Sequence, residues 1–171
     1  MGRFLYPDAY MASAYSIDYG KLYEMGYRGL IFDIDNTLVP HGAPADKKAV
    51  RLFAGLKEMG FRCVLISNNK EPRVKSFSEK AGVLYIYKAA KPKPDAYRRA
   101  MGMMHTDTGS TVFIGDQIFT DILGANLAGI RSVLVKPINP KEEIQIVLKR
   151  YPEKLVLFFY RMRCKKKREV L

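Results

Sequence analysis

Short apolar runs alternate with amphipathic stretches through the middle of the chain, and this alternation limits the fold more than any other feature of the sequence. In residues 46–60, for example, one helical face carries Ala49, Leu52, Phe53, Leu56 and Met59. Strands that alternate with helices are joined as parallel strands by crossover helices, which cover both faces of the sheet. We therefore predict an α/β fold, a three-layer Rossmann-like structure with a central parallel sheet. The predicted strands are residues 29–34, 61–67, 83–87, 111–116 and 131–135, and the predicted helices are residues 46–60, 71–82, 93–104 and 120–129.

The chain has 171 residues, of which 48% are hydrophobic, and this is enough for the core of one domain. Cys63 and Cys164 give no disulfide framework, so we expect free thiols in a reducing compartment. Residues 1–15 lack the apolar core of a signal peptide, and we expect a cytoplasmic protein. The composition divides the chain into an N-terminal aromatic and helical extension (1–28), a core (29–150), and a tail that is first apolar and then polybasic (151–171).

The net charge of +12 indicates an anionic partner. Nucleic acid, an anionic membrane surface and a phosphorylated substrate all fit this charge, and solvated surface lysines are the alternative. Near the C-terminus, the run LVLFFY precedes six basic residues within 161–168. An apolar anchor beside basic charge is typical of peripheral attachment to the inner face of a membrane. A packed helix followed by a solvated tail explains the same pattern equally well, and both interpretations stay open.

Polar side chains follow the predicted strands, and all of them fall at one edge of the predicted sheet. The carboxyl ends of parallel strands meet at the same edge, where ligands bind in such sheets. Carboxylates gathered with a hydroxyl and an amine indicate a site for a phosphate and a hard cation such as Mg²⁺. The sequence has no Cys/His cluster of the kind that binds zinc. The residues are Asp33 and Asp35 at the end of the first strand, Ser67 and Asn68 at the end of the second, Lys91 after the third, Asp116 at the end of the fourth, and Asp121 five residues further on.

These residues form four motifs in a fixed order. They are D-x-D-x-T at 33–37, Ser67, K-P-x-P from Lys91, and GDQIFTD at 115–121. In this order and at these strand ends, the motifs resemble the haloacid dehalogenase (HAD) superfamily of aspartate-nucleophile phosphatases.

The resemblance implies a role for each acidic residue and for one lysine. Asp33 attacks phosphorus and forms an aspartyl-phosphate, and Asp35 protonates the leaving oxygen and then activates water. Mg²⁺ is bound by Asp33, by the backbone carbonyl of Asp35 and by Asp116. Lys91 neutralises the phosphoryl group and holds Asp33. Lys93 occupies the variable position of K-P-x-P, and which of the two lysines faces the site stays open.

The remaining residues of the motifs are candidates for substrate binding or support. Ser67 would bind a phosphoryl oxygen. Thr37 would bind substrate or tie its own loop, and Asn68 would offer its backbone N–H to the phosphate or cap the next helix. Asp121 would orient Lys91 or a metal-bound water. Asn36 stands where many relatives have glycine, and asparagine tolerates unusual backbone angles.

The gaps between the motifs are too short for a large cap, so we expect an open site suited to a bulky phosphate. Residues 3–42 resemble the N-terminal region of the capless YqeG-type subfamily (class IIIA), which includes the mitochondrial phosphatidylglycerophosphate phosphatase. This implies a Mg²⁺-dependent phosphomonoesterase that converts phosphatidylglycerophosphate to phosphatidylglycerol at a membrane surface. The alternatives are a phosphatase of a phosphoprotein or a nucleic-acid phosphate, although no base-stacking motif is evident, and a binding protein with the same fold. The sequence does not predict an oligomeric state.

Overall fold

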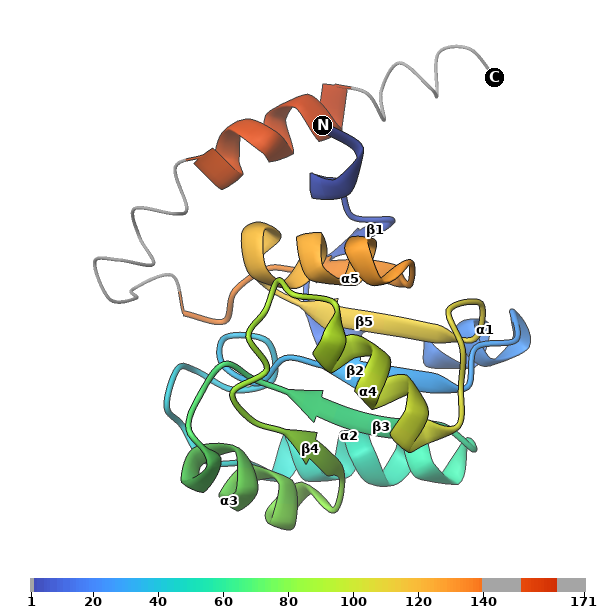
Figure 1. Cartoon of the computed structure of the whole chain (residues 1–171). Helices are drawn as coiled ribbons and strands as arrows, with labels where there is room; N and C mark the ends of the chain where they lie inside the picture. The colour runs from blue at the N-terminus through green and yellow to red at the C-terminus, as the bar shows by residue number, and fades with distance from the viewer. Residues whose placement is uncertain (1, 140–151, 163–171) are drawn as a thin grey trace.

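The computed structural model describes residues 2–139 and 152–162. Its six strands are β1 (Ala9–Met11), β2 (Gly29–Phe32), β3 (Arg62–Ile66), β4 (Leu84–Ile86), β5 (Thr111–Gly115) and β6 (Arg131–Val135). They form one sheet in the order β1-β6-β5-β2-β3-β4, and every pair of neighbours is parallel (Figure 1). Each of the five predicted runs contains one of these strands. The parallel α/β fold is therefore confirmed.

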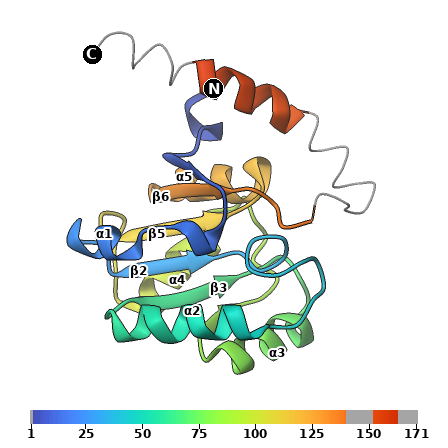
Figure 2. The same cartoon turned by 180° about the vertical axis from the view of Figure 1, so that it is seen from behind.

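Helices cover both faces of the sheet and complete the three layers. They are α1 (Tyr19–Glu24), α2 (Lys47–Glu58), α3 (Glu71–Ala81), α4 (Asp95–Met104) and α5 (Leu123–Ala128), with short turns η1 (Gly2–Leu5), η2 (Ala14–Ser16) and the π-helical η3 (Ile118–Ile122). Residues 152–162 form one more helix, called here the C-terminal helix. In Figure 1 α4 and α5 lie in front of the sheet, and Figure 2 shows α2 on the opposite face.

The helix ends follow from local sequence. α2 begins where the Asp46 side chain accepts a hydrogen bond from Ala49 N at 2.7 Å. α3 carries Pro72 in its first turn, where the missing N–H costs nothing, and ends at Gly82, whose φ of 69° suits glycine. The predicted helix over 71–82 is confirmed in this way.

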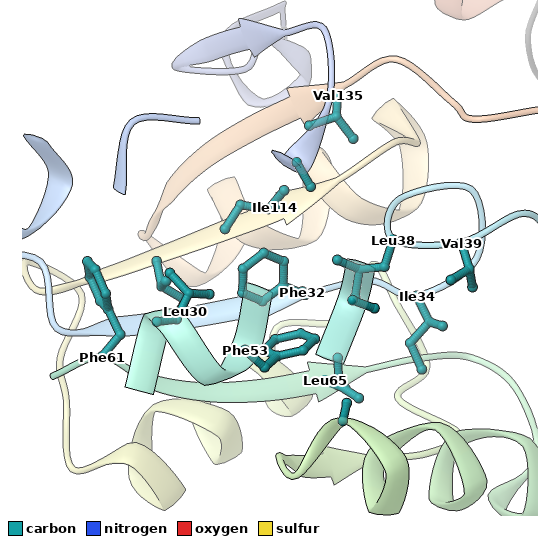
Figure 3. Close-up of a cluster of buried hydrophobic side chains, with 14 of the residues drawn as sticks. Leu30, Phe32, Ile34, Leu38, Val39, Phe53, Phe61, Leu65, Ile114 and Val135 are labelled. Carbon is teal, nitrogen blue, oxygen red and sulfur yellow. The ribbon is translucent and has the colours of Figure 1, made fainter. Parts of the chain in front are cut away.

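Alternate residues of each strand enter two hydrophobic clusters, one on each face of the sheet. Leu30 and Phe32 of β2 pack with α2 and α3, whereas Ile31 between them packs with α4. The rings of Phe32 and Phe53 meet edge to face with centroids 5.3 Å apart (Figure 3). Because β2 is buried on both faces, its sequence is a continuous apolar run without alternation.

The strand β1 was not predicted. It pairs with β6, with Tyr10 opposite Leu134, so part of the N-terminal segment belongs to the sheet. Its three residues are all half-buried. A strand this short has no two-residue alternation that a sequence pattern can detect.

A third hydrophobic cluster joins the N-terminal segment and the C-terminal helix to η3. Glu153 of the C-terminal helix is 5% exposed and accepts a hydrogen bond from Ile118 N at 2.8 Å. The rings of Tyr6 and Tyr160 lie 5.9 Å apart. The apolar members are Leu5, Tyr10, Ile118, Ile122, Leu134, Val156 and Leu157. No helix within residues 2–139 and 152–162 has both the length and the apolar character to cross a membrane.

The part of the chain that the structure describes contains no large cap, as predicted. The two connections that could hold one are short: residues 33–46 link β2 to α2, and residues 87–94 link β4 to α4. Neither connection therefore adds more than a loop over the carboxyl edge of the sheet.

Candidate active site

The three central strands end at one edge, and the predicted polar residues lie there. Asp33 directly follows β2, and Asp116 directly follows β5, the neighbouring strand, with Phe32 paired to Ile114. Ser67 directly follows β3 on the other side of β2. The chain leaves β2 toward β3 and later returns to β5, so the strand order reverses here. Ligands bind beside such reversals in open α/β sheets.

The loop after β2 is fixed by its own apolar side chains. Ile34, Leu38 and Val39 are buried in the same hydrophobic cluster as Phe53 (Figure 3). Asn36 has a φ of 61°, as its residue type allows, and its N–H donates to Val39 O at 2.7 Å. This tight turn holds the preceding acidic residues at the sheet edge.

Lys91 joins two carboxylates in the centre of the site. Its Nζ donates hydrogen bonds to Asp33 Oδ1 and Asp121 Oδ1, both at 2.6 Å. Lys91 is 8% exposed, whereas Lys93 is exposed, so Lys91 is the lysine of the K-P-x-P motif that faces the acidic cluster. Asn68 fixes this loop, since its side chain accepts from Lys91 N at 2.8 Å and donates to Lys91 O at 3.2 Å.

Burial and charge decide how these groups titrate. Burial raises the pKa of Asp33 to about 7, with Asp121 and Asp35 acting in the same direction and Lys91 opposing them. Burial alone would lower the pKa of Lys91, but the carboxylates of Asp121 and Asp33 outweigh it and the pKa is raised. Lys91 therefore keeps its proton.

A divalent cation fits the acidic cluster. Among the described residues, Asp33, Asp116 and Asp121 can bring one carboxylate oxygen each within 4.8 Å of one another, and all three are buried. The hydroxyl of Thr37 lies 3.5 Å from Asp33 Oδ2 and 3.4 Å from Asp116 Oδ1. Within the described residues, Lys91 is the cation that pairs with these buried acids, so they keep an excess of negative charge, which a bound cation would balance.

Asp121 is already surrounded by donors. Besides Lys91, its carboxylate accepts hydrogen bonds from Asp116 N at 3.2 Å and Gln117 N at 3.1 Å. The hydroxyl of Tyr97 lies 3.1 Å from the carbonyl oxygens of Thr120 and Asp121 and holds η3 in place. These contacts suit Asp121 to orienting Lys91 and leave Asp33 and Asp116 as the better cation ligands.

The carboxylate of Asp35 points away from Lys91 toward the loops on the β3 side. Its Oδ1 accepts hydrogen bonds from Gly42 N at 2.8 Å and Arg73 Nη2 at 3.0 Å, and its Oδ2 accepts one from Asn69 Nδ2 at 2.6 Å. His41 Nδ1 lies 4.0 Å from Oδ1. The side chain of Asp35 is 11% exposed, slightly more than the 8% of Asp33.

Sequence patterns placed most of this site but missed two of its residues. The structure brings Asp33, Thr37, Lys91, Asp116 and Asp121 into contact, while the Ser67 hydroxyl oxygen accepts a hydrogen bond from Asn69 N at 3.2 Å. The side chain of Asn68 contacts the Lys91 loop, and no capping side chain is found at the start of α3. Asn69 and Arg73 were not predicted. Their position in the sequence could have indicated them, because the residues between the end of a strand and the first turn of the next helix lie at the ligand-binding edge of the sheet.

The arrangement provides a buried carboxylate held by a lysine, a second acid two residues further along the loop, and further acids for a cation. Such a set can attack, neutralise and protonate a phosphate ester. Residues 88–141 match a protein-family profile described as HAD-hydrolase-like.

Sequence similarity to known proteins places the chain among phosphatases, and a solved structure shares its fold. The chain is 38% identical over 156 residues to the "Probable phosphatase YqeG" of Bacillus subtilis (strain 168), covering 91% of each protein. It is 23% identical to phosphatidylglycerophosphate phosphatase 1 of Arabidopsis thaliana, over 85% of this chain and 44% of that longer protein. The cobalt-bound deoxy-D-mannose-octulosonate 8-phosphate phosphatase of Haemophilus influenzae shares the fold, with a TM-score of 0.54 at 16% identity over 68% of this chain and 81% of that one. The chain therefore belongs to the YqeG family of HAD-superfamily phosphatases, which are phosphoric monoester hydrolases.

Proposed function

We propose that this phosphatase is Mg²⁺-dependent, acts through an aspartyl-phosphate on Asp33, and removes the terminal phosphate of phosphatidylglycerophosphate at the cytoplasmic face of a membrane. One observation carries the chemistry: Lys91 joins the carboxylates of Asp33 and Asp121 beside Asp116 in a buried cluster at the sheet edge. A lysine held between two buried acids is costly to build for stability alone, so it supports a catalytic role.

In the proposed mechanism, the carboxylate of Asp33 forms a bond to phosphorus while the bond to the leaving oxygen breaks. Asp35 gives that oxygen a proton, and its carboxylate then takes a proton from the water that hydrolyses the aspartyl-phosphate. Lys91 keeps Asp33 oriented and balances charge on the phosphoryl oxygens. Ser67, Thr37 and the backbone near Asn68 are the candidate groups for binding those oxygens.

Asp33, Asp116 and the main-chain carbonyl of Asp35 would hold Mg²⁺, with Asp121 supporting Lys91. Oxygen ligands without His or Cys are typical of Mg²⁺ sites. When bound, the ion would lower the repulsion between the anionic nucleophile and the anionic phosphate.

The lipid substrate is supported by the open edge and by the C-terminal helix. Leu155, Phe158, Phe159 and Met162 on this helix are each at least half exposed. A cavity of about 410 Å³ lies between the helix and Asp116, with Arg161 and Lys154 also in its lining. Apolar side chains beside cations are typical of attachment to an anionic lipid surface. The Arabidopsis relative is named as a phosphatidylglycerophosphate phosphatase, which supports the same substrate.

The sequence division at residues 28/29 and 150/151 stays a proposal. Within it, 1–28 packs on the core through β1, and 151–171 supplies the membrane contact. The polybasic residues 163–168 lie outside the described residues. The net charge of +12 also favours a second candidate, a phosphoprotein or nucleic-acid phosphate as substrate.

Phosphate release from p-nitrophenyl phosphate, from phosphatidylglycerophosphate in vesicles, and from phosphopeptides and 3′-phosphorylated oligonucleotides tests the proposal. We expect turnover that needs Mg²⁺, stops with EDTA, disappears in Asp33→Asn, and is fastest on the lipid. Absence of metal-dependent turnover would overturn the chemistry. Faster turnover of a phosphopeptide or an oligonucleotide would overturn the lipid assignment alone.

A further inference from the structure

Asp35 is held by hydrogen-bond donors from three separate segments of the chain. Gly42 belongs to the loop after β2, Asn69 to the loop after β3, and Arg73 to the first turn of α3. His41 Nδ1 lies 4.0 Å from Oδ1 of this carboxylate, and Asp33 is close enough to interact with it electrostatically. Sequence motifs assign a role to Asp35 but none to Asn69 or Arg73.

The contacts leave Asp35 one way to carry a proton. A carboxylate has about four lone-pair sites, and the donors from Gly42, Arg73 and Asn69 occupy three of them. One site therefore remains for the proton that is transferred. Removing a donor would let the carboxylate rotate and would place its proton in more than one direction.

Arg73 is held mainly by packing and by this acid. Its guanidinium carbon lies 5.6 Å from the centre of the Phe77 ring, and its side chain is 20% exposed. Asp35 is its sole acidic partner among the described residues. The Arg73 Nε is buried and has no hydrogen-bond partner within the same residues. An arginine kept at the cost of an unpaired buried donor is better explained by its effect on Asp35 than by stability.

We propose that Arg73 and Asn69 are positioning residues that fix the orientation of Asp35 for proton transfer to the leaving oxygen. This inference rests on the proposed function, which makes Asp35 the acid–base group. As the bond between phosphorus and the leaving oxygen breaks, the proton on the remaining site of Asp35 moves to that oxygen. The carboxylate left behind takes a proton from water in the second half of the reaction. Misplacing such a group by about 1 Å can cost about 10²-fold in rate.

The test compares two esters that differ in their need for a proton. Phenyl phosphate has a poor leaving group that requires protonation, whereas 2,4-dinitrophenyl phosphate has a good one that does not. The value of kcat/KM reports the steps up to formation of the aspartyl-phosphate. We expect Arg73→Met to lower kcat/KM for phenyl phosphate by about 10- to 100-fold, and for the dinitrophenyl ester by less than about 3-fold. Arg73→Lys should recover part of the loss.

Four further variants make the result specific. Asn69→Ala should show the same selectivity through a different segment, which keeps the test valid if Arg73→Met fails to fold. In Asp35→Asn, adding Arg73→Met should lower turnover of phenyl phosphate no further. Arg98→Met removes an exposed arginine from α4 and should leave both activities unchanged.

Equal losses on both esters would show that Arg73 and Asn69 are structural only, and no loss on phenyl phosphate would remove them from the reaction; either result overturns the inference. Failure of the proposed function looks different. Wild-type protein would then turn over neither ester in an Asp33-dependent manner, and both proposals would fall together.

Discussion

Lys91 is the residue on which the charges of the site depend. Its ammonium group lies 2.6 Å from a carboxylate oxygen of Asp33 and 2.6 Å from one of Asp121, and all three side chains are buried. Lys91→Met would leave these acids facing each other without a cation. We expect a loss of about 3–5 kcal/mol in the free energy of unfolding, and a fall in kcat of at least about 10²-fold.

Urea denaturation and turnover of p-nitrophenyl phosphate measure the two effects of Lys91→Met. Lys93→Met is the matched control, because Lys93 belongs to the same K-P-x-P motif but is exposed. It should change stability by no more than about 0.5 kcal/mol. If both variants behaved alike, the assignment of Lys91 to the site would be wrong.

Gly115 is required by the close approach of β5 to the acidic cluster. A Cβ at this position would lie 2.6 Å from Asp121 Oδ2 and 2.7 Å from Phe113 Cε1. Gly115→Ala must therefore displace Asp121, and with it Lys91. We expect the variant to be destabilised by about 1–3 kcal/mol. We also expect its activity to fall by more than the decrease in the fraction of folded protein.

Gly102→Ala is the control for Gly115→Ala. Gly102 lies within α4, and its Cβ would meet no atom within 4 Å. Alanine should stabilise this helix by about 0.5–1 kcal/mol and leave the activity unchanged. Thermal unfolding and steady-state assays of both variants test this prediction. Full activity in Gly115→Ala would contradict the requirement for glycine at this position.

Cys63 should react slowly with alkylating reagents in the folded protein. Burial raises the pKa of its thiol to about 12, so at pH 8 very little of it is the reactive thiolate. Iodoacetamide labelling followed by mass spectrometry should modify the peptide that contains Cys63 far faster in urea than in buffer. Equal rates in urea and in buffer would mean that the thiol of Cys63 is accessible in the folded protein and that its pKa is not raised.

At the scale of helices and strands, the sequence predicted the elements that have long hydrophobic patterns. Five strands and the helices between them have clear apolar periods, and their order implies the parallel sheet. β1 was missed because it has three residues. The π-helical η3 (Ile118–Ile122), which overlaps the start of the predicted helix at 120–129, was missed because its wider turn depends on tertiary contacts, such as those of Tyr97, which no local pattern reports.

The same limit applies to the site. Motifs located Asp33, Lys91, Asp116 and Asp121, because each follows a strand whose end could be read from the sequence. Arg73 lies in the first turn of an amphipathic helix, where charged residues are usually solvated. Only the packing of α3 brings it to 3.0 Å from Asp35, and that distance could not be inferred from spacing along the chain.

The anchoring of η3 by Tyr97 gives a prediction at this scale. Tyr97→Phe removes the hydroxyl that lies 3.1 Å from the carbonyl oxygens of Thr120 and Asp121. We expect a loss of about 1 kcal/mol in stability and a lower kcat, because η3 carries Asp121. Tyr85→Phe removes a hydroxyl 3.4 Å from Glu71 near the surface and serves as the control. A drop in kcat for Tyr85→Phe as large as that for Tyr97→Phe would argue against the anchor.

At the scale of the molecule, the acidic cluster and the exposed apolar helix face lie near the same edge. The C-terminal helix is fixed to η3 by the buried carboxylate of Glu153, and η3 carries Asp121. The cavity of about 410 Å³ reaches from Asp116 to Phe158, which is itself 58% exposed. A helix that bound a lipid surface would therefore bring that surface close to the proposed nucleophile.

This arrangement predicts that membrane binding and chemistry can be separated. Leu155 and Phe159 are 59% and 50% exposed, so replacing both with serine should barely affect folding. We expect Leu155→Ser/Phe159→Ser to float poorly with vesicles that contain anionic lipid and to keep its turnover of p-nitrophenyl phosphate. Turnover of phosphatidylglycerophosphate in vesicles should fall with the binding. Met59→Ser/Leu84→Ser is the control, because these side chains are 48% and 51% exposed but lie outside the C-terminal helix. Flotation that is lost equally in both double variants, or in neither, would exclude the C-terminal helix as the membrane contact. That result would leave the proposed phosphatase chemistry untouched, because the proposed mechanism depends on Asp33, Lys91 and their neighbours and not on this helix.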